Sequence, residues 1–148
     1  MKTVFDKSTS EELINRINLL SENSTARWGK MNVYQMLKHC TVCEEMYQGK
    51  TEHKRVLLGR LIGRVALKGI LKDDKPLRQN SPTSPDFKIT ENEGDVSAEK
   101  AKWVTLIEAY DHYSPVKFTH WFFGEMTKEQ VGIFVYKHAD HHLRQFNA

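Results

Sequence analysis

The sequence predicts an all-α protein built as a four-helix bundle. Four segments carry apolar residues at helical spacing, each with a capping residue at its start: 8–22, 32–48, 97–113 and 127–146. No stretch has the convincing alternation of apolar and polar residues that a half-buried strand requires. A bundle also suits the histidines described below, because facing helices can build a metal site in their shared core.

Length and composition define the class of protein. We expect the 148 residues to form one domain, residues 1–148, with a sizeable core. The hydrophobic content of 39% and charged content of 28% predict a soluble globular protein. The balance of 22 basic to 19 acidic residues is no nucleic-acid signature by itself, so no nucleic-acid partner is expected. Neither a signal peptide nor a membrane-spanning run is expected, and Cys40 and Cys43 fit a reduced, cytoplasmic protein.

The first two helices have recognisable starts. Ser8 or Thr9 is expected to cap the first helix, with an acidic residue three positions further on. Asn32 is expected to cap the second helix, which runs to about Gln48. The inward face of the second helix carries Val33, Met36, Leu37, Cys40, Cys43 and Tyr47. His39 lies at the edge of that face.

The middle of the chain is harder to interpret. Residues 51–72 have helical periodicity, with one apolar side and a basic row formed by Arg60, Arg64 and Lys68. A membrane-surface helix has this pattern, but we prefer a helical excursion that covers one end of the bundle, and we expect no membrane partner. A polar connection with three prolines follows at 73–95 and is expected to be the most mobile internal segment. The stretch 120–124 is expected to be an aromatic loop.

The last helix carries the main functional signal. Thr127 and Gln130 match a capping box, which predicts a helix from there to about Phe146. His138 and His142 lie one turn apart in the middle of its apolar face. An apolar face normally excludes groups that need hydrogen-bond partners, so two stacked imidazoles at this spacing favour a metal site over a pair satisfied by polar neighbours.

A third ligand is expected from the second helix. His39, His138 and His142 would form a three-histidine site for a divalent ion, with zinc or nickel preferred and iron or manganese as alternatives. Three protein ligands leave an open position, which is the catalytic pattern. His141 and His120 are candidates for an outer-shell or alternative ligand. Asp140 is expected to be solvated, and the two cysteines are interpreted as small core residues.

The sequence resembles the DinB/YfiT-like metalloenzyme superfamily. The resemblance rests on RWGKMNVYQMLKH at 27–39 and YKHADHHLRQF at 136–146, and the stretch HWFFGEMTKEQ at 120–130 fits one uncharacterised branch. It does not extend to residues 50–95. The resemblance implies an up-down-down-up bundle with an extra helical excursion and a long loop between its second and third helices. It also implies a divalent metal held by His39, His138 and His142, and homodimers.

Two functions from different classes remain open. The first is a metal-dependent enzyme acting on a small molecule, either a hydrolase or, from the resemblance, a transferase that uses a low-molecular-weight thiol. The second is a non-catalytic metal-binding or stress-related module. No residue identifies the thiol, and no obvious acid–base residue accompanies the histidines.

Overall fold

The computed structural model describes all residues from 1 to 148 and is mainly helical. Its elements are α1 (Lys7–Asn18), α2 (Val33–Tyr47), α3 (Leu57–Ile70), the 3-10 turn η1 (Pro85–Phe87), α4 (Val96–Glu108), the 3-10 turn η2 (Ala109–His112), β1 (Lys117–His120), β2 (Gly124–Thr127) and α5 (Lys128–Gln145). The four long segments predicted as helices are therefore helical. The excursion at 57–70 and the long connection after it also lie where the sequence placed them.

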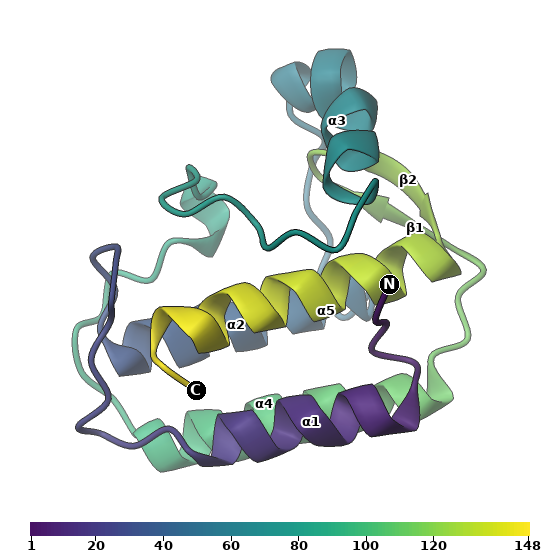
Figure 1. Cartoon of the computed structure of the whole chain (residues 1–148). Helices are drawn as coiled ribbons and strands as arrows, with labels where there is room; N and C mark the ends of the chain where they lie inside the picture. The colour runs from purple at the N-terminus through teal and green to yellow at the C-terminus, as the bar shows by residue number, and fades with distance from the viewer.

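Four helices enclose the core. α2 packs against α4 and α5, and α1 packs against the same two helices (Figure 1). All four helices contribute large side chains with no more than 2% exposure: Leu13, Ile17, Met36, Leu37, Trp103, Ile107 and Leu143. Burial of this apolar surface is the main stabilising term, at about 25 cal/mol per Å².

The caps confirm two of the predicted helix starts and correct two others. Complete capping boxes begin α2 at Asn32 and α5 at Thr127. α1 instead begins after Asp6, whose carbonyl accepts hydrogen bonds from the following turn. α4 begins after Asp95, whose side chain accepts a hydrogen bond from the Ala98 amide at 2.8 Å. Asp6 lies two residues before Ser8 and three before Thr9, and Asp95 lies two residues before the start of the segment 97–113. Asp95 is an equally good cap by residue type.

The stretch expected to be an aromatic loop forms the turn of a small β-hairpin, which the sequence did not predict. β1 and β2 pair antiparallel, from Lys117 opposite Thr127 to His120 opposite Gly124. The Nδ1 atom of His120 accepts hydrogen bonds from the amides of Phe122 and Phe123, at 3.1 and 3.3 Å, and so closes the turn. Gly124 ends the turn with φ of +83°, a conformation that favours glycine.

α3 packs on this hairpin through its glycines. A Cβ atom at Gly59 or Gly63 would overlap the backbone of Phe122, so only glycine permits this approach. The glycine side is therefore the buried side of α3. The apolar side of α3 faces solvent, so the excursion does not contact the rest of the protein through its apolar residues.

The segment 71–95 runs along α5 and is fastened to the helices (Figure 1). The Lys137 ammonium of α5 donates to the carbonyls of Asp73 and Lys75, at 2.5 and 2.8 Å. Phe87 in η1 is buried, with its ring 4.6 Å from His53 and 5.8 Å from Trp121. These contacts are anchors that the polar composition of the segment did not predict, while its relative mobility stays a prediction.

Candidate metal centre

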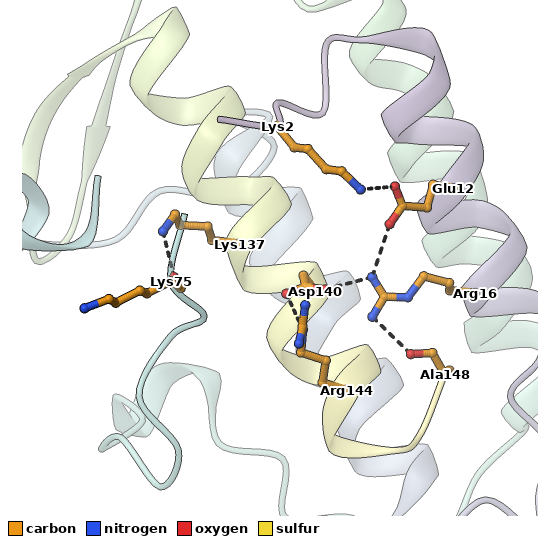
Figure 2. A network of polar contacts seen from close by, with 8 residues as sticks. All are labelled: Lys2, Glu12, Arg16, Lys75, Lys137, Asp140, Arg144 and Ala148. Carbon is orange, nitrogen blue, oxygen red and sulfur yellow. Dashed lines mark hydrogen bonds and ion pairs between the residues drawn. The ribbon is translucent and has the colours of Figure 1, made fainter. Parts of the chain in front are cut away.

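α5 is held in place on two sides, which fixes the positions of its histidines. Asp140 accepts from the Arg16 guanidinium of α1 at 2.8 Å and from Arg144 at 2.7 Å (Figure 2). Lys137 binds the segment 71–95 on another side of the same helix. Asp140 is buried, so the expectation that it is solvated is wrong. Two arginines supply the partners that a buried carboxylate needs.

The structure brings together the three histidines selected from the sequence. One ligand atom from each of His39, His138 and His142 lies within 4.8 Å of the others. The ring centroids are 4.8 Å apart for the two α5 histidines, and the His39 ring lies 4.9 Å from His142 and 5.4 Å from His138. This cluster could hold a metal ion.

A hydrogen bond to the main chain fixes the tautomer of His39 and so decides which ring nitrogen keeps a lone pair. Its Nδ1 atom lies 2.8 Å from the carbonyl oxygen of Phe87. A carbonyl only accepts, so Nδ1 carries the proton and donates, and Nε2 keeps its lone pair, which lies 3.7 Å from the Cys43 thiol. Metal-bound histidines almost always donate their other N–H in this way, which fixes the tautomer and the ring orientation.

His142 is oriented by a second chain of hydrogen bonds. The Gln145 Nε2 atom donates to the Trp28 carbonyl at 2.8 Å, which turns Gln145 Oε1 toward His142 Nδ1 at 2.9 Å. His142 Nδ1 must therefore donate, and its Nε2 lone pair is free. Gly29, with φ of +82°, leaves room for the Gln145 amide, and the Arg27 amide donates to the Gln145 carbonyl at 2.8 Å.

His138 supplies the test of whether a metal fits. Its Nδ1 atom is buried with no hydrogen-bond partner, although the residue as a whole is partly exposed. Buried polar atoms in proteins are nearly always satisfied, so an unpartnered imidazole nitrogen beside two oriented imidazoles fits a group that binds a metal ion. Imidazole nitrogens around tetrahedral zinc at about 2.0–2.1 Å stand roughly 3.3 Å apart, so the cluster must contract modestly to bind.

The surroundings keep all three histidines neutral, as metal ligands must be. Burial lowers the pKa of His142 to about 3, with the neighbouring His39 adding to the effect. Burial also holds the pKa of His138 well below its usual value, and the neighbouring imidazoles lower this pKa further. The pKa of His39 is lowered by burial as well, partly offset by its hydrogen bond to Phe87. Neutral lone pairs are therefore available over the physiological pH range.

The other two candidate histidines lie outside this group of three. His120 uses Nδ1 to accept the two amides of its turn, so its remaining nitrogen carries a proton, which disfavours it as an alternative ligand. His141 lies with its ring 5.1 Å from His142 and 5.8 Å from Trp28.

Both cysteines are free and buried, as the core interpretation requires, but one of them also touches the site. Cys43 Sγ lies 3.7 Å from His39 Nε2, the ring nitrogen that is not bonded to the Phe87 carbonyl. Burial raises the pKa of both thiols, so they are protonated in this environment. The spacing of His39 and Cys43, four residues apart on one helix, was the signal that could have predicted this contact.

The fold and the cluster thus define a mainly helical protein with a buried triple-histidine group. The chain belongs to the family described as "Protein of unknown function (DUF1569)", whose family model matches residues 4–148. That range contains every helix, both strands and all three clustered histidines. No curated protein and no solved structure matches the chain.

Proposed function

We propose that this protein is a divalent-metal-dependent enzyme whose ion is held by His39, His138 and His142. The observation that carries the proposal is the convergence of three neutral imidazoles from two helices, two of them with their tautomers set for binding through Nε2. Zinc or nickel is the preferred ion, because both accept nitrogen ligands in a site of this size, with iron or manganese as alternatives.

We also place the fold in the DinB/YfiT-like superfamily. α1, α2, α4 and α5 would form its up-down-down-up four-helix bundle, and α3 with the segment 71–95 would be an insertion between the second and third bundle helices. The arrangement of two ligands on the last helix and one on the second supports this placement. So does the packing of α2 and α1 against both α4 and α5. The free, buried cysteines fit a cytoplasmic setting.

The chain's own residues would bind the ion and orient its ligands. A divalent ion in this site would act as a Lewis acid toward a small molecule in its open position, whether for hydrolysis or for transfer to a low-molecular-weight thiol. The Phe87 carbonyl and Gln145 hold two of the imidazoles in the binding orientation. The aromatic rings of Tyr47 and Phe134, at 5.9 and 6.2 Å from the His138 ring, exclude water from one side. The partial exposure of His138 provides the approach for a substrate.

Metal content and a single ligand change test the binding step. Protein purified without chelator should contain about one divalent ion per chain, as measured by elemental mass spectrometry. His138→Ala should abolish binding, because two remaining imidazoles do not hold the ion against water, while the exposed His112→Ala should bind normally. A native stoichiometry in His138→Ala would refute the site. A screen of thiol conjugation and ester hydrolysis with the loaded protein tests the reaction.

A non-catalytic metal-binding module is the second candidate, and one observation favours it. The buried carboxylate nearest in sequence to the cluster, Asp140, is fully occupied by Arg16 and Arg144, so it is not available for proton transfer. Thermal unfolding with and without a chelator separates the two functions. A structural ion should stabilise the fold strongly, and its removal should unfold the chain, whereas an enzyme with a preformed site should stay folded.

A further inference from the structure

The exposed apolar side chains of this protein are concentrated on one helix. Six of the nine exposed large apolar residues lie within residues 56–65: Val56, Leu57, Leu58, Leu61, Ile62 and Val65. The other three, Met1, Leu19 and Val116, are widely separated in sequence. Within α3 the apolar residues follow helical spacing, so they form a single stripe, here called the α3 stripe (Leu57, Leu58, Leu61, Ile62 and Val65).

The opposite side of α3 is already occupied, which fixes the direction in which the stripe points. Gly59, Gly63 and Leu67 are buried, and the two glycines rest on the backbone of Phe122. Figure 1 shows α3 on the hairpin, at the side of the molecule away from α1 and α4. The helix therefore presents its stripe outward while it stays attached to the protein.

Strong positive charge accompanies the stripe. Residues 53–72 contain six basic residues and no acidic one: Lys54, Arg55, Arg60, Arg64, Lys68 and Lys72. None of the six forms an ion pair. Arg60, Arg64 and Lys68 follow one another at four-residue spacing, so they line one edge of the stripe.

We infer that α3 is an in-plane anchor that binds the protein to an anionic lipid surface. Helices that lie in the membrane interface combine an apolar face, buried by about 5–10 Å, with Lys and Arg at its edge near the phosphates. α3 has both features, and its 14 residues give a helix about 21 Å long. No helix of the structure is long and apolar enough to cross a bilayer, so the contact would be made from the surface.

A second copy of this chain is the competing occupant, and the charges disfavour it. In a twofold dimer the same surface meets itself, which would bring the cations of two α3 helices together with no acidic residue of 53–72 to offset them. A standard interface also needs about 20–30 residues from each partner. The α3 stripe supplies five, and no other cluster of exposed large apolar side chains extends it.

Co-sedimentation with vesicles tests this inference directly. The full chain should sediment with vesicles of 30% phosphatidylserine in phosphatidylcholine but not with pure phosphatidylcholine, and binding should weaken as salt is raised. Arg60→Gln with Lys68→Gln should lower binding about 30-fold, from about one kcal/mol per charge. Lys7→Gln with Lys102→Gln, on α1 and α4, should change it by about 2-fold or less, since these charges lie away from the lipid surface.

Matched apolar substitutions test the α3 stripe itself. Leu61→Gln with Val65→Gln should lower vesicle binding by about 10-fold or more, because two inserted aliphatic side chains are lost. Leu19→Gln should leave it unchanged, although Leu19 and Leu61 are both 74% exposed. Circular dichroism checks that each variant is folded, and sedimentation velocity without lipid should give the native chain and the Leu61→Gln, Val65→Gln variant the same oligomeric state.

Three results would overturn the inference. The first is vesicle binding by the Leu61→Gln, Val65→Gln variant that equals that of the native chain. The second is no binding of the native chain to phosphatidylserine vesicles. The third is a native dimer that this variant dissociates, which would make the α3 stripe an interface between copies.

Discussion

Replacing Gln145 by Ala tests whether the hydrogen bond at His142 sets the metal affinity. The change removes the acceptor at 2.9 Å from His142 Nδ1, so the ring no longer has a preferred tautomer or orientation. Loss of such an outer partner typically lowers metal affinity 10–100-fold, which corresponds to about 1.4–2.7 kcal/mol. Competition between the protein and a chromophoric zinc chelator measures the difference directly.

Gln145→Glu is the matched control. A carboxylate keeps an acceptor beside His142 Nδ1 but cannot donate to the Trp28 carbonyl as the native amide does. This variant should lose stability, because one buried hydrogen bond is worth about 1 kcal/mol, yet it should bind zinc at least as tightly as the native chain. Affinities are compared well below the unfolding temperature of each variant, so that stability does not enter the measurement.

Two outcomes would refute this reasoning. If the Ala and Glu variants both bind zinc within about 2-fold of the native chain, orientation of His142 contributes nothing. If both are equally weak, Gln145 acts by holding the loop at Trp28 rather than by orienting the imidazole.

Three further predictions concern ionisable and sulfur-bearing groups. The Cys40→Ser, Cys43→Ser variant should keep its metal; loss of the ion from this variant, with binding retained in His138→Ala, would make the cysteines the ligands. The metal-free protein should lose stability as pH falls from about 6.5 toward 3. In this range the unfolded chain protonates an imidazole such as His142, which stays neutral in the folded chain. Urea titrations at several pH values measure the free energy of unfolding. Burial raises the pKa of Glu44 to about 7, so its ionisation should cost stability as pH rises from about 4.5 through 7, and Glu44→Gln should raise the melting temperature at pH 8 but not at pH 4. An equal effect at both values would show that the ionisation of Glu44 is not responsible.

The ligands were predictable because they lie in regular, strongly patterned helices. The capping box at Thr127 fixes the start of α5, and the four-residue spacing then places His138 and His142 on one face. The groups that orient these ligands were not predictable in the same way. Phe87 acts through its carbonyl, which no residue type reveals, and it lies 48 positions from His39.

The features that the sequence did not predict, which are the hairpin, the packing of α3 and the burial of Asp140, also have physical explanations. The strands of the hairpin are four residues each, too short for alternation to be distinguished from chance. The packing of α3 was not predicted because its glycines, rather than its leucines, make the tertiary contact. A close approach of two backbones cannot be read from the spacing of apolar residues. Asp140 was expected in solvent because its partner Arg16 lies 124 positions away.

The attachment of the segment 71–95 links the ligand cluster to distant parts of the chain. One end of the segment is bound by Lys137 of α5, and its Phe87 carbonyl holds His39 of α2. When the segment 71–95 is attached in this way, it favours the orientation of His39 that can bind an ion. By thermodynamic reciprocity, an ion bound to His39 would favour the attached segment by the same factor. α3 leads directly into this segment, so the segment is the covalent link between α3 and the contacts at Lys137 and His39.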